Sequence, residues 1–139
     1  MRHALTGIPM LVSGGEVVDV QNDHTLFSHR HPRTALGLSK SADTMILVVV
    51  DGRQPGYSKG LKTGQLARLL IAHGAHRAVN LDGGSSSTLV IPSLGGLVND
   101  PCFKKAQERS VPNHLGILRV DSSAGFWKKI LSPLAVLLG

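Results

Sequence analysis

Residues 44–52 read TMILVVVDG, an unbroken apolar run that ends in an acidic turn. A run rich in β-branched residues, without alternation of polar and apolar positions, is typical of a strand in the middle of a sheet with both faces covered. We therefore expect a central strand over 44–50. Asp51 should then lie where this strand emerges from the sheet.

The segment from Lys62 to His73 predicts the one prominent helix of the chain. Thr63 is a suitable N-cap, Gly74 is a suitable C′ residue, and the leucines between them recur on one face. A second short apolar segment, 78–81, follows the helix and ends at Asp82. This order predicts a crossover between two parallel strands.

Further strands are expected on both sides of this unit. A glycine turn at 13–15 joins two short apolar segments and predicts a hairpin. The remaining candidate strands are 34–38, 88–91 and 114–120. Strands outnumber helices, so the predicted class is α+β, with a mixed β-sheet, one crossover helix and an active crevice at the C-terminal ends of the strands.

Two Asp-Gly turns flank the predicted crossover, Asp51-Gly52 and Asp82-Gly83. Parallel strands present their C-terminal loops at one edge of a sheet, where ligands collect. Gly83 and Gly84 leave main-chain N–H groups open to an oxygen-rich anion beside the Asp82 carboxylate. The alternative is that each Asp-Gly pair is only a turn, because both residues favour turns regardless of function.

Three arginines lie near these turns in the sequence or in the adjoining segments: Arg33, Arg53 and Arg109. A guanidinium group binds phosphate or carboxylate through two parallel hydrogen bonds. The alternative for each arginine is an ordinary surface salt bridge.

The 139 residues fit one domain, and 15 Lys and Arg against 9 Asp and Glu give a net charge of +6, with 7 histidines in addition. This balance favours anionic partners. Nucleic acid is disfavoured because the basic residues are scattered, aromatic residues make up only 4%, and no nucleic-acid-binding signature is present. The single cysteine, Cys102, excludes an internal disulfide and a cysteine-based zinc site.

Other sites are disfavoured by missing patterns. The hydroxyl run 85–88 lacks the Gly-x-Ser-x-Gly elbow of many serine hydrolases, and the glycine-rich loop lacks the Gly-Lys-Ser/Thr of a P-loop. His24, His29 and His31 lack metal-ligand spacing and are interpreted as solvated loop residues.

The chain ends carry two weaker patterns. The N-terminal residues resemble the start of a signal peptide, but polar and proline residues break the apolar stretch, so no signal is predicted. The apolar tail 126–139 is too short to span a bilayer. We favour a packed terminal element there over a peripheral membrane anchor or the remainder of a longer apolar segment.

Four stretches, in this order, resemble the phosphodiester glycosidase family. They are HPRTALG (31–37), VVVDGRQPGYS (48–58), NLDGGSSSTLV (80–90) and RSVPNHLG (109–116). The family contains the uncovering enzyme, which removes N-acetylglucosamine from mannose-6-phosphate diesters, and bacterial proteins associated with exopolysaccharide synthesis. The resemblance covers roughly Pro9 to Val120, and we expect a family-like domain over 1–125.

The resemblance implies hydrolysis of a sugar joined through its anomeric carbon to a phosphodiester. Asp82 is the preferred carboxylate at the anomeric centre, and Asp51 is either a second carboxylate or an orienting residue. Because phosphate is a good leaving group, arginines can stabilise the departing charge in place of a protonating acid. The expected substrate- and phosphate-binding residues are Arg33, Thr34, Gly52, Arg53, Gly83, Gly84, Ser85, Ser86, Arg109 and Asn113.

Two departures from the family pattern qualify this expectation. The Asn-Gly-Gly-Phe-Phe-type segment that usually opens the domain is missing, which predicts a chain without the front of the family domain. Ser85 also stands where a third glycine is common, and a serine there is strained if the position needs φ > 0. The alternative function is a non-catalytic phosphate- or glycan-binding module on the same fold.

The expected partner is an anionic glycan or a sugar-phosphodiester substrate. No cofactor is expected. Asn80, Asp51 and Asp82 offer oxygen ligands to a divalent cation, but the EF-hand spacing is not present. The resemblance implies an extracytoplasmic location.

Overall fold

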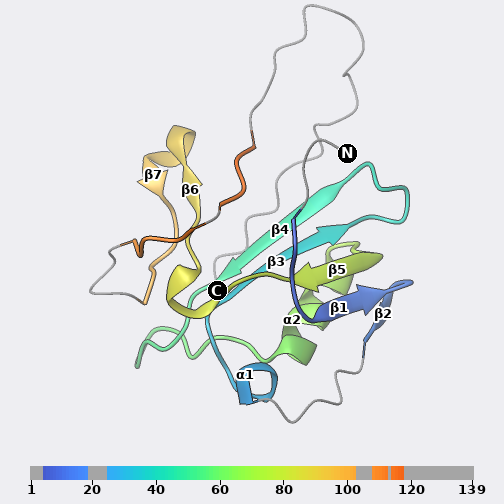
Figure 1. Ribbon diagram of the computed structural model, residues 1–139, viewed down its shortest axis with the longest axis horizontal. Coiled ribbons are helices and arrows are strands. Elements are labelled where there is room, and N and C mark those ends of the chain that lie inside the picture. The colour runs from blue at the N-terminus through green and yellow to red at the C-terminus, as the bar shows by residue number, and fades with distance from the viewer. Residues whose placement is uncertain (1–4, 19–24, 103–107, 113, 118–139) are drawn as a thin grey trace, which may run out of the picture.

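The computed structural model describes residues 5–18, 25–102, 108–112 and 114–117, and its main body is a five-stranded sheet with a helix against one face (Figure 1). A two-stranded hairpin stands beside this body. The elements in chain order are β1 (Met10–Ser13), β2 (Glu16–Val17), α1 (Thr25–Ser28), β3 (Arg33–Leu38), β4 (Met45–Val50), α2 (Thr63–Ala72), β5 (Arg77–Asn80), β6 (Val90–Ile91) and β7 (Gly96–Leu97).

Every pairing in the main sheet is antiparallel, in the strand order β2-β1-β5-β3-β4, so the predicted mixed sheet is wrong. β3 lies between β4 and β5 and pairs with both, which separates the two strands that the helix connects. Because each of them is antiparallel to β3, β4 and β5 still run in the same direction, as their arrowheads in Figure 1 show. Asp51 and Asp82 therefore follow strands that finish at the same end of the sheet.

β4 is an edge strand, not the central strand that its apolar sequence predicted. Its last three residues, Val48 to Val50, are nevertheless buried. An apolar run indicates that both faces of a strand are covered, but it does not indicate whether the strand pairs with one neighbouring strand or with two.

Helix α2 confirms the prediction for 62–73, with its N-cap one residue earlier than expected. The N-cap is Lys62, whose backbone N–H donates to Gln65 Oε1 at 3.1 Å. The Thr63 hydroxyl instead donates to the carbonyl of Phe27 at 3.1 Å and ties the helix start to α1. Gly74, with φ +89°, ends the helix as predicted.

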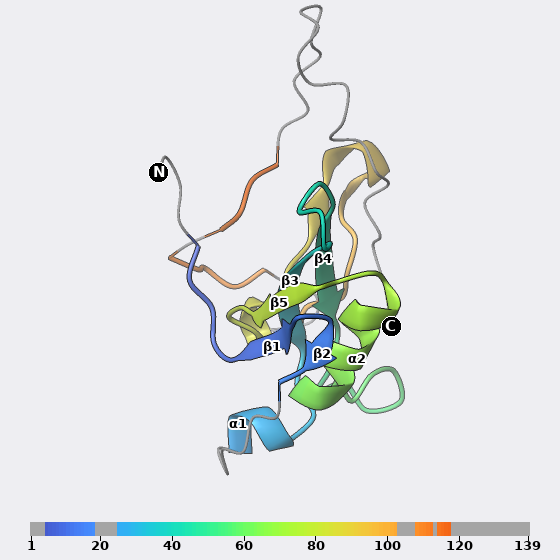
Figure 2. The same ribbon diagram turned by 90° about the vertical axis from the view of Figure 1, so that its right-hand side faces the viewer.

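The core lies between α2 and the sheet face that it covers (Figure 2). Gly37 lets the segment that follows α2 pack closely against β3, because a Cβ on Gly37 would lie 3.0 Å from Ala75 Cβ. Burial of the apolar side chains on these facing surfaces is the main stabilising term. The buried core residues are Leu11, Val12, Ala35, Ile46, Val48, Val50, Leu66, Ala67, Leu70, Ala75 and Ala78.

The outer segments agree with the predictions only in part. The hairpin is confirmed, with Val12 opposite Val17 and Ser13 opposite Glu16. In the strand predicted over 114–120, residues 114–117 form no strand, and the others lie outside the described residues, as do His24, Asn113 and the tail 126–139. No helix in the described part of the chain has the length and hydropathy needed to cross a membrane.

Candidate functional site

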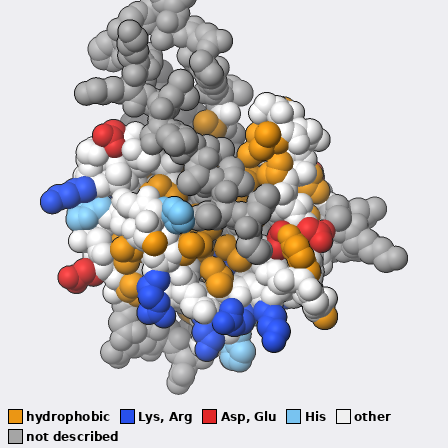
Figure 3. Space-filling view, turned by 180° about the vertical axis from the view of Figure 1, so that it is seen from behind, with side chains coloured by type: hydrophobic (Ala, Val, Ile, Leu, Met, Phe, Trp, Pro, Cys, Tyr) orange, Lys and Arg blue, Asp and Glu red, His pale blue; other side chains and the backbone are white. Residues whose placement is uncertain are grey.

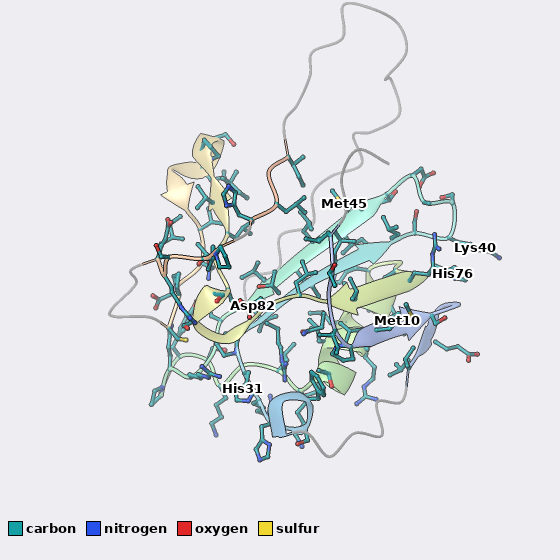
Figure 4. The ribbon with its side chains drawn as sticks, viewed as in Figure 1. Met10, His31, Lys40, Met45, His76 and Asp82 are labelled. Carbon is teal, nitrogen blue, oxygen red and sulfur yellow. The ribbon has the colours of Figure 1, made fainter. Side chains whose placement is uncertain are left out.

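A cavity of about 540 Å³ lies at the end of the sheet where β5 finishes and β3 begins. Figure 4 shows His31 and Asp82 at this end, with Lys40 and His76 at the opposite end of the sheet. The lining comes from five places: the segment 6–8, Phe27 with residues 31–33, Arg53 after β4, residues 80–85 at and after the end of β5, and Arg109.

The first and third family-like stretches meet here backbone to backbone. Leu81 N–H donates to the Thr34 carbonyl at 2.8 Å, and Gly84 N–H donates to the Pro32 carbonyl at 2.9 Å. A Cβ on Gly83 would lie 2.9 Å from that same Pro32 oxygen, so a larger residue does not fit without moving main chain. Gly83 is therefore required for the packing of these two stretches.

The second stretch packs against the first in the same way. A Cβ on Gly52 would lie 2.8 Å from Gly60 Cα and 2.8 Å from the Pro32 nitrogen. His31 and Leu61 form an isolated antiparallel bridge, with N–H to carbonyl distances of 3.2 and 3.0 Å. The loop after β4 is thereby fixed against the start of β3.

Asp82 is exposed and lines the cavity. Within the described part of the chain, no hydrogen bond or ion pair engages its carboxylate. A carboxylate with unused lone pairs at a cavity wall is available to accept a proton or to attack a bound group.

Asp51 has the opposite environment. It is only 3% exposed and is not among the residues that line the cavity. Its Oδ1 accepts from Asn99 Nδ2 at 2.8 Å, and its Oδ2 accepts from the backbone N–H of Asp100 at 3.0 Å and from the Tyr57 hydroxyl at 3.2 Å. Desolvation and the neighbouring Asp51 carboxylate raise the pKa of Tyr57. The geometry suits a carboxylate that ties the hairpin segment to the end of β4.

Arg33 and Arg109 both line the cavity, with different surroundings. Arg33 is 5% exposed, and its guanidinium donates to the carbonyls of Leu61 at 2.9 Å and His29 at 3.0 Å. Burial and the nearby Arg53 lower the pKa of Arg33, although an arginine stays charged at neutral pH. Arg109 is exposed and donates from Nη1 to Ser85 Oγ at 3.1 Å.

Arg53 is the third arginine at the cavity. Its backbone has φ +59°, one of two described non-glycine residues in the left-handed region. One edge of its guanidinium faces His31 Nδ1, at 3.1 Å from Nη2 and 3.3 Å from Nε. A Cβ on Gly84 would lie 3.2 Å from its Nη1, so the guanidinium lies directly against the Gly84 backbone.

The other predicted residues divide into two groups. Ser85 lines the cavity with Gly83 and Gly84, and it does not adopt positive φ, so the serine in place of a third glycine is unstrained. Thr34, Gly52 and Ser86 are not part of the lining. Thr34 instead bonds Ser87 Oγ at 3.3 Å. Asn113 lies outside the described residues.

Lining residues that the sequence analysis did not assign to the substrate site include Phe27, His31 and Asn80. The Asn80 side chain donates to the carbonyls of Ile8 at 2.8 Å and Leu81 at 2.9 Å, and its buried Oδ1 accepts no hydrogen bond in the described region. His31 and Asn80 open the first and third family-like stretches, which was the available signal. No group of three potential metal ligands occurs among the residues described.

Positive charge extends beyond the cavity. Seen from behind, Lys and Arg side chains gather along the lower edge of the molecule, with few acidic side chains among them (Figure 3). In Figure 1 this is the side on which α1 and the loop after β4 lie. Such a surface attracts anionic ligands.

The family model for phosphodiester glycosidases matches residues 1–118. The chain belongs to this family. No curated protein matches the chain. Among solved structures, the chain is similar to the catalytic domain of zebrafish N-acetylglucosamine-1-phosphodiester α-N-acetylglucosaminidase, auto-inhibited by its pro-peptide, with 27% identity and a TM-score of 0.64. It is also similar to a hypothetical protein from Synechocystis, with 29% identity and a TM-score of 0.51.

The similarity covers 77% of this chain and 39% of the zebrafish chain. For the Synechocystis protein the shares are 65% and 17%. The chain therefore corresponds to less than half the length of these relatives.

Proposed function

We propose that this chain hydrolyses the bond between the anomeric carbon of a sugar and the oxygen of a phosphodiester. The observation that supports this most strongly is the composition of the cavity wall, where the Asp82 carboxylate, which no described residue engages, lies among Arg33, Arg53 and Arg109. A substrate with an electrophilic carbon next to an anionic group fits such a wall, because the carboxylate faces the electrophilic carbon and the arginines face the anionic group.

The arginines bind the phosphate and stabilise the negative charge that grows on it as the bond to the sugar breaks. Arg53 lies against Gly84 and Arg109 donates to Ser85 Oγ, so two guanidinium groups converge on the turn that follows β5. The N–H groups of Gly84 and Ser86 already donate to main-chain carbonyls, so neither is available to the phosphate. Arg33 adds positive charge from a buried position.

Asp82 serves the anomeric carbon, either as nucleophile or as the base that activates water. No other carboxylate is present among the described lining residues. A phosphate needs less help from a protonating acid than a sugar alkoxide does, so a single carboxylate with arginines is a sufficient set.

Asp51 acts as an orienting residue in this proposal and not as a second catalytic carboxylate. Its three hydrogen bonds fix the turn that carries Arg53. By analogy with the zebrafish enzyme, N-acetylglucosamine is the first sugar to test.

The second candidate is a module that binds a phosphodiester glycan without turning it over. It is favoured by the limited span of the similarity, which leaves most of the zebrafish chain without a counterpart here. The cavity and its arginines serve either function.

The test is release of free sugar from UDP-N-acetylglucosamine by the purified chain. We expect release by the wild type and none by Asp82→Ala, with both proteins folded by circular dichroism. Equal release by the two proteins contradicts the catalytic role of Asp82. Binding of UDP-N-acetylglucosamine without release by the wild type favours the binding module.

A further inference from the structure

We infer that His31, as a neutral imidazole, fixes the Arg53 guanidinium against the Gly83–Gly84 turn and so positions it to bind the substrate's phosphate group. The inference rests on the proposed function for the identity of the ligand. His31 is a positioning residue in this account, because it acts through Arg53.

The first support is the way the two side chains meet. Arg53 directs both Nε and Nη2 to a single acceptor, His31 Nδ1. An imidazole nitrogen accepts a hydrogen bond only when it carries no proton, so the His31 proton must be on Nε2. These contacts use one edge of the guanidinium.

The second support is the set of guanidinium N–H donors that do not bond His31. Nη1 faces the Gly84 backbone, and the hydrogen bonds of Arg53 within the described part of the chain are those to His31. Its free donors therefore lie at the cavity wall, next to the glycine turn after Asp82. An exposed arginine loses much rotamer freedom when it binds a ligand, and a contact that orders it beforehand reduces that cost.

The third support is the rigidity of the acceptor. The His31 backbone is bridged to Leu61 in both directions. Gly60 has φ +82° and passes so close to the His31 carbonyl that no side chain fits at position 60. The imidazole therefore projects from a fixed part of the main chain.

Protonation of His31 ends this arrangement, since Nδ1 becomes a donor facing a cation. Burial, followed by the positive charges of Arg53, Arg33 and His29, lowers the pKa of His31. The neutral form therefore persists to lower pH than in an exposed histidine. The negative charge of a bound phosphate acts in the opposite direction and raises the pKa of His31. The charged groups around His31 are His29 and Arg33 near it in sequence, Arg53 after β4, Asp82 after β5, and Arg109.

The first experiment needs no ligand. Nitrogen-15 NMR of the wild type at about pH 7.5 should show the His31 proton on Nε2 and a slowly exchanging Arg53 Nε–H signal. The signal should persist in His31→Asn, whose Oδ1 replaces Nδ1 as acceptor, and should be lost in His31→Phe. A His31 proton on Nδ1, or an unchanged Arg53 signal in His31→Phe, overturns the inference whether or not the protein is an enzyme.

The second experiment measures binding of UDP-N-acetylglucosamine by calorimetry. His31→Phe should bind about tenfold more weakly than the wild type, and His31→Asn within about twofold. The affinity of the wild type should decrease as the pH falls towards about 5, and the affinity of His31→Asn should not. His73→Asn, at an exposed position beyond α2, should match the wild type.

A double variant separates positioning from general damage to the fold. In an Arg53→Ala background, His31→Phe should cause no further loss of affinity. An additional tenfold loss there contradicts the inference. Binding with this pattern but without sugar release contradicts only the proposed hydrolysis, whereas no binding by the wild type removes the phosphate role of Arg53 together with the proposed function.

Discussion

The side-chain amide of Asn99 donates to Asp51 Oδ1 at 2.8 Å, and both side chains are buried. Asn99 also donates to the Ser87 carbonyl at 3.0 Å and accepts from the Leu89 N–H at 2.7 Å. One amide thus connects the end of β4 with the segment that leads into the small hairpin. The two Asp-Gly turns have divided roles, since Asp51 is engaged in structure while Asp82 faces the cavity.

Asp51→Asn should destabilise the fold by about 3 kcal/mol. The asparagine NH₂ group replaces one carboxylate oxygen, so a hydrogen-bond donor that faced this oxygen faces another donor and is left without an acceptor. Chemical denaturation of the variant measures this. Asp43→Asn is the matched control, since Asp43 lies in an exposed turn and accepts its hydrogen bonds, as far as the structure describes them, from the nearby Ser39 and Thr44. Its free energy of unfolding should stay close to that of the wild type. Equal stability of the two variants contradicts the structural role of Asp51.

Gly52→Ala should cost at least about 2 kcal/mol, because the added Cβ meets main-chain atoms of Gly60 and Pro32 at 2.8 Å and none of them belongs to a movable side chain. Gly64→Ala is the opposite case. Its Cβ meets nothing nearer than Arg68 Nη2 at 3.9 Å, and alanine favours the helix by about 1 kcal/mol. Thermal denaturation should therefore lower the melting temperature of the first variant and raise that of the second. An unchanged melting temperature of Gly52→Ala contradicts the described packing of the stretch 48–58 against the stretch 31–37.

The lowered pKa of His31 predicts a pH dependence of stability. In the unfolded chain this histidine takes up a proton at higher pH than in the folded chain. The stability that it contributes is therefore present above the unfolded pKa of about 6.5 and decreases as the pH falls through that value. Denaturation curves from about pH 8 to pH 5 should show a steeper loss for the wild type than for His31→Asn. The same pH dependence of stability in the wild type and in His31→Asn contradicts the lowered pKa of His31.

Attack at the anomeric carbon predicts which bond breaks. Hydrolysis of UDP-N-acetylglucosamine in oxygen-18 water should place the label in the released sugar, because water replaces the phosphate oxygen at that carbon. Mass spectrometry of both products detects it. Label in the phosphate product would mean that Asp82 does not serve the sugar side of the bond.

Local patterns in the sequence predicted the separate elements. The leucine stripe before Gly74 gave helix α2 nearly to the residue, and the glycine turn at 13–15 gave the first hairpin. The order of strands was not predictable, because an apolar run such as 45–50 has the same pattern at an edge as at the centre of a covered sheet. The insertion of β3 between β4 and β5 depends on pairings across many residues.

The site shows the same division. The Asp-Gly turns and Arg53 were found because acidic and basic residues next to glycine stand out locally. The buried state of Asp51 was not foreseen, since its partner Asn99 lies 48 positions away in a segment interpreted as a loop. His31 was set aside for a similar reason, because its contact with Arg53 spans 22 positions.

The most direct test of the divided roles compares turnover and stability in Asp82→Asn and Asp51→Asn. Initial rates of sugar release from UDP-N-acetylglucosamine are measured at a temperature where both variants are folded, together with their melting temperatures. Asp82→Asn should lose at least about a thousandfold in kcat with an unchanged melting temperature, while Asp51→Asn should melt lower and keep much more of its turnover when folded. A folded Asp82→Asn protein that releases sugar at the wild-type rate contradicts the account.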